Sequence, residues 1–164
     1  MIVVSDTTPI ISLLKIGHLS LLKDLFQMVY VPRAVYRELT VNDTFADEAE
    51  LVKKSTYIQQ VEVINADNVT LLQRATGLDI GESEAIIYSD ENSNSLLLMD
   101  EAKGRAVASQ MGIRIMGTIG LLLLAYQKSL LSSDEIITCI DDLQKNNRHI
   151  SSRLYQQLIR EIKN

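Results

Sequence analysis

The stretch Gly77–Arg105, "GLDIGESEAIIYSDENSNSLLLMDEAKGR", places acidic residues on both sides of a buried strand. Within it, Leu96–Met99 is a short, continuous apolar run, which is typical of a strand buried on both faces. Asp100 and Glu101 follow this run without a spacer, and Glu82 stands in the first turn of the helix predicted before it. Charged side chains therefore occur where the core of the protein meets its surface, and their placement needs a physical explanation.

Strands and helices alternate along most of the chain. Between the apolar segments lie stretches with helical spacing, such as the one that contains Ala102, Ala106 and Val107. Strands that alternate with helices form a parallel sheet with both faces covered, so we expect an α/β protein, a three-layer α/β/α sandwich with a parallel sheet of about five strands. The expected strands are Ile2–Ser5, Met28–Val31, Tyr57–Ile64, Leu96–Met99 and Ile113–Met116.

The tail of the chain, after Leu131, predicts two further helices. One opens at Ser132 with "SSDE", a capping-box pattern, and the other begins at Ser151 with "SSRLYQQLIREI". With 164 residues and 46% hydrophobic content, the chain is long enough for one domain with a proper core and too short for two ordinary ones. We expect a single domain over residues 1–164, in which 132–164 form a C-terminal helical extension.

The composition narrows the kinds of site that the chain can hold. No stretch approaches the roughly 18 uncharged apolar residues of a membrane span, and the amino terminus lacks the basic region of a signal peptide. We therefore expect a soluble, cytoplasmic protein. One cysteine and two histidines cannot form an internal disulfide or an ordinary structural zinc site, so any metal must have oxygen ligands. The net charge of −5 disfavours a large nonspecific nucleic-acid-binding surface, although a catalytic cluster of acids could account for most of it.

Four acids are expected at one edge of the sheet, where ligand sites of such folds lie, beyond the carboxyl ends of the strands. Asp6 follows the first strand and Asp100 the fourth, while Glu38 lies two turns into the helix after Pro32 and Glu82 opens another helix. From these places the four carboxylates can point at the same spot. Because they would repel each other at low dielectric, the arrangement is sensible mainly if a hard divalent cation such as Mg²⁺ or Mn²⁺ neutralises them. Metal-activated water could then attack a phosphodiester.

Each of these acids also has a purely structural interpretation. Asp6 and Asp100 could cap the helices that follow them. Glu38 could be an ordinary solvated helix residue, and Glu82 or Glu84 could simply stabilise a helix N-terminus through the macrodipole. The common placement of the acids, rather than any one of them, favours a functional site.

Five ordered segments, "VVSDTTPIISLLKIG", "VPRAVYREL", "GLDIGESEAI", "LLLMDEAKGRAVASQMGI" and "MGTIGLLLLA", together resemble a PIN-domain protein. The resemblance is to the prokaryotic branch related to toxin ribonucleases of toxin–antitoxin systems, and it covers roughly Met1–Leu131. It implies a PIN-like fold and an Mg²⁺- or Mn²⁺-dependent endoribonuclease. The acids that it assigns to catalysis and metal binding are Asp6, Glu38, Glu82 and Asp100.

The chain departs from the pattern of that family at two positions. The third acid is usually Asp, whereas this sequence has Glu82, with Glu84 as an alternative half a turn on. Ala102 occupies the place where many members carry a further acid, which favours one bound metal, or a second that binds only with substrate. The resemblance also assigns a supporting role to the hydroxyl of Thr7. A catalytically weak or inactive nucleic-acid-binding module is the alternative function.

Basic residues near the same edge are candidates for contact with RNA. Lys103 and Arg105 lie in the helix that follows Asp100, and Lys15 and Arg37 lie on helices that start near the acids. Such side chains are more often simply solvated. If they bind RNA, they do so through phosphate, which contributes affinity without reading the sequence.

The resemblance implies an RNA substrate, a homodimer and, as a further partner, an antitoxin protein. A haloacid-dehalogenase-like phosphatase is a less favoured alternative, since it also has an Asp after its first strand and acids after its fourth. However, Thr8 stands two residues after Asp6, where that family carries its general acid.

Overall fold

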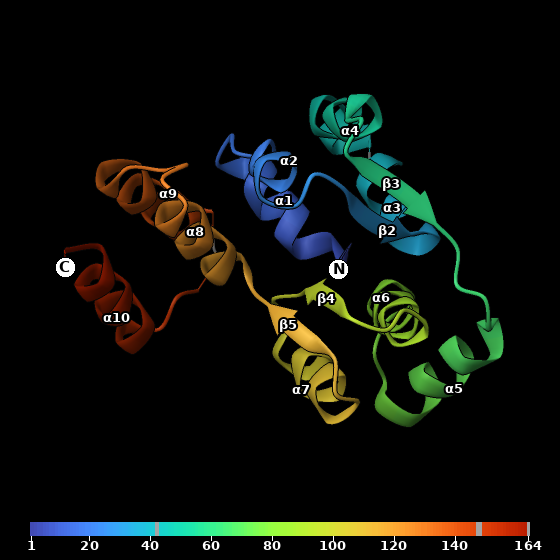
Figure 1. Cartoon of the computed structure of the whole chain (residues 1–164). Coiled ribbons are helices and arrows are strands. Elements are labelled where there is room, and N and C mark those ends of the chain that lie inside the picture. The colour runs from blue at the N-terminus through green and yellow to red at the C-terminus, as the bar shows by residue number, and fades with distance from the viewer. Residues whose placement is uncertain (42, 147–148, 164) are drawn as a thin grey trace.

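The computed structural model describes residues 1–41, 43–146 and 149–163. Five parallel strands form one sheet in the order β3-β2-β1-β4-β5, with helices on both sides of it (Figure 1). The predicted α/β class with a five-stranded parallel sheet is therefore confirmed. The strands are β1 (Ile2–Ser5), β2 (Val29–Pro32), β3 (Ile58–Val61), β4 (Ser95–Leu98) and β5 (Arg114–Met116).

The helices fill the connections between the strands and continue beyond β5. They are α1 (Thr7–Lys15), α2 (Leu21–Phe26), α3 (Arg33–Thr40), the 3-10 helix η1 (Asp43–Phe45), α4 (Ala46–Lys54), α5 (Ala66–Thr76), α6 (Ile80–Glu91), α7 (Ala102–Gln110), α8 (Thr118–Gln127), α9 (Ser133–Lys145) and α10 (Ser152–Lys163).

Successive side chains of the central strands enter two separate cores, because strand residues alternate between the faces of a sheet. Val3 and Leu96 belong to the larger core, which α1, α2, α8 and α9 cover. Val4 and Leu97 belong to the smaller core, which α6 and α7 cover. Both faces of the sheet are therefore covered at its centre, which explains why the sequences of β1 and β4 are largely apolar without alternation.

The third strand ends earlier than its sequence predicted. The expected strand Tyr57–Ile64 extends only from Ile58 to Val61, so the prediction was wrong beyond Val61. The backbone N–H groups of Ile64 and Asn65 donate instead to the carboxylate of Glu91, at 3.0 and 2.9 Å. A side chain from α6 thus satisfies backbone groups that the sheet would otherwise have paired.

The two C-terminal helices are present, as predicted. The Ser132 hydroxyl accepts a hydrogen bond from the Glu135 N–H, and the Glu135 carboxylate accepts one from the Ser132 N–H, at 3.2 and 2.7 Å. This is the capping box expected from "SSDE". At the other end of the tail, the Tyr126 hydroxyl donates to the Ile162 carbonyl at 3.1 Å, which ties α10 to α8.

The most apolar helix, α8, belongs to the larger core. Leu121 and Leu122 are fully buried and Ala125 packs beside them. In the part of the chain that the structure describes, no helix is both long and apolar enough to span a bilayer.

The carboxyl ends of β1 and β4 form the topological switch point of the sheet. From β1, the chain builds outward through β2 and β3 on one side and through β4 and β5 on the other. Ser5 pairs with Leu98, and the Asp6 N–H donates to the Leu98 carbonyl at 3.0 Å. Asp6 and Asp100 therefore emerge at the edge where ligand crevices form in such sheets.

Candidate functional site

Asp6 is buried at the carboxyl end of the central strand. Only 4% of the residue is exposed, and although it occupies the N-cap position of α1, its side chain makes no capping hydrogen bond. Burial raises the pKa of its carboxyl from 3.8 to about 7, against a lowering by the Thr7 backbone N–H. The value of about 7 already includes smaller increases caused by the nearby carboxylates of Glu82, Asp79 and Glu38. The structure thus brings several acids to one place around a carboxylate that water barely reaches.

Glu38 reaches this cluster from α3. The Thr7 hydroxyl donates to Glu38 Oε2 at 2.7 Å, so Thr7 orients a carboxylate of the candidate site. A Cβ added to Gly81 would lie 3.6 Å from Glu38 Oε2 and 3.5 Å from Asp79 Oδ1. These two carboxylates therefore flank the same spot, and the glycine leaves the space between them open.

Asp79 and Glu82 form a capping box at the start of α6. The Glu82 N–H donates to Asp79 Oδ1 at 2.8 Å, and the Asp79 N–H donates to Glu82 Oε2 at 3.0 Å. Burial raises the pKa of Glu82, and the negative charges of Asp79 and Glu101 also raise it. The hydrogen bond from the Asp79 backbone and the positive charge of Lys103 lower it. Sequence reasoning missed Asp79, although the spacing "DIGE" is a capping-box signal that could have identified it.

Glu84 has a different environment from Glu82. Its Oε2 accepts a hydrogen bond from the Ala34 N–H, at 2.8 Å, in the first turn of α3. Glu84 therefore connects α6 to the N-terminus of the helix that carries Glu38, where a negative charge also interacts favourably with the helix dipole. Glu82 and Glu84 were the two candidates for the third acid of the site. Glu82 lies near Asp6, whereas Glu84 binds the backbone at the start of α3.

Asp100 binds the start of α8 rather than the other acids. Its two carboxylate oxygens accept hydrogen bonds from the Thr118 backbone N–H, at 2.7 Å, and from the Thr118 hydroxyl, at 2.6 Å. Thr118 is buried, and the backbone at Gly117 is so close that an added Cβ would lie 3.0 Å from Asp100 Oδ1. The structure thus brings Asp6, Glu38 and Glu82 together, with Asp79, whereas Asp100 is hydrogen-bonded to the first residue of α8.

The chemistry of these side chains fits a hard divalent cation. They supply only oxygen donors, which Mg²⁺ and Mn²⁺ prefer, and a cation would offset both the burial of Asp6 and the negative charges around it. Within residues 1–41, 43–146 and 149–163, however, no three His, Cys, Asp or Glu side chains are already placed to hold a metal. A cation would have to draw in the longer side chains, Glu38 and Glu82.

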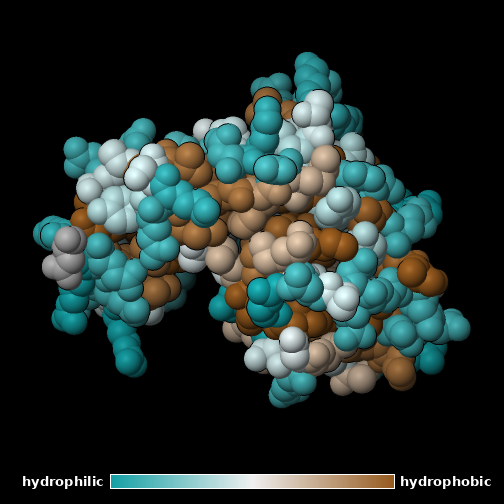
Figure 2. All heavy atoms as spheres, in the orientation of Figure 1, coloured by the Kyte–Doolittle hydropathy of each residue, from teal (hydrophilic) through white to brown (hydrophobic). Residues whose placement is uncertain are grey.

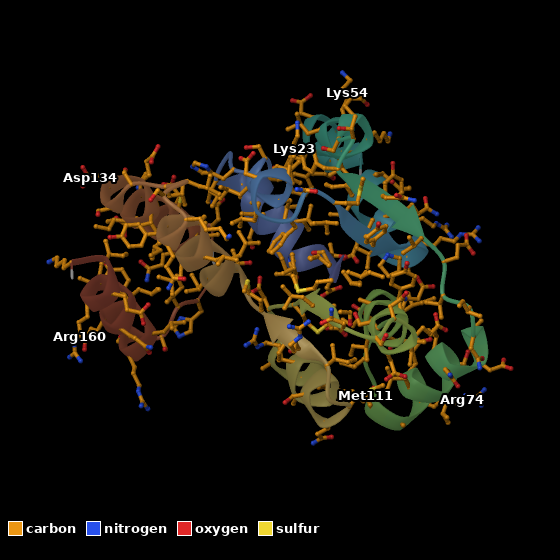
Figure 3. All side chains as sticks on the ribbon, in the orientation of Figure 1. Lys23, Lys54, Arg74, Met111, Asp134 and Arg160 are labelled. Atoms are coloured by element: carbon orange, nitrogen blue, oxygen red, sulfur yellow. The ribbon has the colours of Figure 1, made fainter. Side chains whose placement is uncertain are left out.

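Lys15, one of the predicted RNA contacts, has other partners. Its Nζ lies 3.1 Å from Glu48 Oε1 and 4.2 Å from the centre of the Phe45 ring. Other basic side chains lie on four separate helices (Figure 3): Lys23, Lys54, Arg74 and Arg160.

The other three predicted cations differ in their surroundings. Lys103 is exposed and lies near enough to Glu82 to lower its pKa. Arg105 is half-buried and donates through Nη1 to the Met99 carbonyl at 2.9 Å. Arg37 is exposed and precedes Glu38 on α3.

Fold and site together define an α/β protein with a carboxylate cluster at the switch point of its sheet. A family model described as a PIN domain matches residues 2–164. The chain therefore belongs to the PIN-domain family, whose members are typically metal-dependent nucleases, and the resemblance seen in the sequence is confirmed. This membership removes the basis for the phosphatase alternative. Comparison with curated proteins and with solved structures gave no match.

Asp6→Asn should stabilise the metal-free protein at alkaline pH. The pKa of the Asp6 carboxyl is about 7 in the folded chain, whereas its ordinary value is 3.8. At pH values between these two, the folded state keeps a proton that the unfolded state releases. The stability contributed by this carboxyl is therefore complete below the lower value and is lost as pH rises through the upper one. In urea unfolding, the variant should be a few kcal/mol more stable than the parent at pH 8, and the difference should shrink towards zero at pH 4.

Asp100→Ala is the matched control, because it also removes a carboxylate from this edge. It should lower the unfolding free energy at pH 8 by about 1–3 kcal/mol, since the buried Thr118 N–H loses its acceptor. If Asp6→Asn were instead less stable than the parent at pH 8, a structural role of Asp6 would outweigh its desolvation.

Glu82→Gln and Glu84→Gln should separate the roles of the two neighbouring acids. Both variants keep a side-chain oxygen that can accept the hydrogen bonds now made to Asp79 and Ala34. At pH 8, the rise in melting temperature on adding Mn²⁺ should largely disappear in Glu82→Gln and persist in Glu84→Gln. The opposite result would assign the third acid to Glu84.

Proposed function

We propose that the chain is an Mg²⁺- or Mn²⁺-dependent endoribonuclease that hydrolyses phosphodiester bonds in RNA. Membership of the PIN-domain family supports nuclease chemistry. The observation that carries the proposal is the buried carboxyl of Asp6, with its pKa raised to about 7 and three further carboxylates around it. Strongly perturbed acids of this kind concentrate at functional sites, because folding alone does not favour them.

The cluster would hold the cation through Asp6, Glu38, Asp79 and Glu82. A cation bound there would supply a Lewis acid for the phosphate and would lower the pKa of water. The side chains of the cluster would fix the position of this cation and its electrostatic environment. Thr7 orients Glu38 through the 2.7 Å hydrogen bond, and the burial of Asp6 keeps water away, which strengthens its electrostatic interactions.

The residues after β4 contribute beside the cluster. Thr118 fixes both carboxylate oxygens of Asp100, so this acid is oriented before any substrate arrives. Lys103 and Arg105, on the helix that follows, are suited to bind the phosphates of an RNA strand that crosses the acids. Such contacts would hold RNA of many sequences with similar affinity.

An RNA-binding module without catalysis is the second candidate function. It is favoured by one observation, namely that among the described residues no three ligand-type side chains are preassembled around a metal position. In that case a proton rather than a cation would neutralise Asp6 at pH values below its pKa of about 7.

The purified protein should cleave unstructured RNA in Mn²⁺ or Mg²⁺ and should stop when EDTA is added. Asp6→Asn should lower the rate by about 100-fold or more, the loss typical of removing one preorganised charge from a transition state. End-labelled RNA resolved on a denaturing gel measures both effects.

The Asp6→Asn protein, purified in parallel, also serves as the control for contaminating nucleases. Equal cleavage in EDTA, or equal cleavage by Asp6→Asn, would contradict the proposal. RNA that is retained on the protein but yields no product in either metal would support the non-catalytic module.

A further inference from the structure

A cleft of about 630 Å³ lies between the sheet and the C-terminal helices. Figure 2 shows the surface hollowed between the part formed by α9 and α10 and the body that carries β5. Its volume is within the range of small-molecule binding sites. The cleft is built from distant parts of the chain, with Ile115 from β5, Leu123 from α8, Leu143 from α9, and Ile150 and Leu154 from the C-terminal residues.

This cleft adjoins the candidate active site. Thr7 binds Glu38 in the acid cluster, and the next residue, Thr8, lines the cleft. Asp100 and Thr118, whose side chains are hydrogen-bonded to each other, also line it. An RNA strand with a phosphate at the acids would therefore place a neighbouring nucleoside at the mouth of the cleft.

The walls of the cleft combine apolar surface with a few polar groups. The aliphatic side chains can cover the faces of a flat ring, while Arg105 adds a positively charged group to the lining. Ser12, which is 1% exposed, also lines the cleft, and among the described residues its hydroxyl has no hydrogen-bond partner. A heteroatom of a ligand, or an ordered water, would satisfy that buried group. A nucleobase has the matching chemistry, namely apolar faces and polar edges.

We propose that the cleft binds the base of a nucleotide next to the scissile phosphate. The proposal rests on the ribonuclease function proposed above and adds a subsite to it. The tail of the chain then takes part in substrate binding, because α10 supplies Leu154 and the segment before it supplies His149 and Ile150. An apolar helix of a protein partner is the competing occupant, but it would offer no negative charge to the Arg105 guanidinium that lines the cleft.

The test uses the absence of tryptophan from the sequence. Leu154→Trp places a single tryptophan at the cleft, at a position that is 36% exposed. Leu71→Trp, 66% exposed on α5, is the matched reporter away from the cleft, and it corrects for light absorbed by the nucleotides. His149→Trp is a second reporter at the exposed rim of the cleft, should Leu154→Trp fail to fold.

Each reporter is titrated in EDTA with AMP, GMP, CMP and UMP, and with ribose 5-phosphate as a ligand without a base. We expect a saturable loss of most of the fluorescence of Leu154→Trp with at least one nucleotide, no such loss for Leu71→Trp, and none with ribose 5-phosphate. No saturable loss, or equal losses in both reporters, would overturn the proposal. Binding of an apolar dye that nucleotides do not displace would also overturn it and would indicate a protein-docking surface.

Failure of this proposal is distinguishable from failure of the proposed function, because the titration requires no cleavage. Nucleotide binding without ribonuclease activity would contradict the enzymatic function but would support the base-binding site. Cleavage of RNA without any nucleotide-dependent change in the fluorescence of Leu154→Trp would support the enzymatic function and contradict the base-binding site.

Discussion

The burial of the Asp6 carboxyl is the constraint on which the rest of the site depends. Asp6 continues the central strand, and its backbone N–H is bonded to the Leu98 carbonyl, so the sheet itself holds it away from water. Glu82, Asp79 and Glu38 then add negative charge around a group that is already desolvated. Either a proton or a cation can relieve this penalty, which couples the stability of the fold, pH and metal binding in one carboxyl.

Carboxylates at helix N-termini organise the surroundings of Asp6. Glu84 binds the first turn of α3, Asp79 caps α6, and Asp100 binds the first residue of α8. Each interaction satisfies a backbone N–H that lacks a partner within its own helix. Acids at this edge of the sheet therefore position three helices. Two of them, α3 and α6, carry other acids of the cluster, and the third, α8, borders the neighbouring cleft. Structural and functional carboxylates occur side by side here, and only their partners distinguish them.

Much of the fold followed from local patterns in the sequence. The continuous apolar run before Asp100 predicted a strand buried on both faces, and β4 is buried on both faces. The "SSDE" pattern at Ser132 predicted a capping box because both of its hydrogen bonds join residues three apart. The same kind of signal, "DIGE" at Asp79, was present but was not used. The extent of β3 was overestimated, because its end is set by Glu91 on another element.

The sequence by itself determined the alternation of strands and helices and the positions of Asp6 and Asp100 after two strands, since such features depend on neighbours a few residues apart. Only the tertiary structure decided which side chains these acids meet. Asp100 binds Thr118, and Glu84 binds the backbone of Ala34, 50 residues away. Long-range pairings of this kind depend on strand order and helix packing, which local spacing does not encode. The same packing forms the cleft, whose walls come from both ends of the chain.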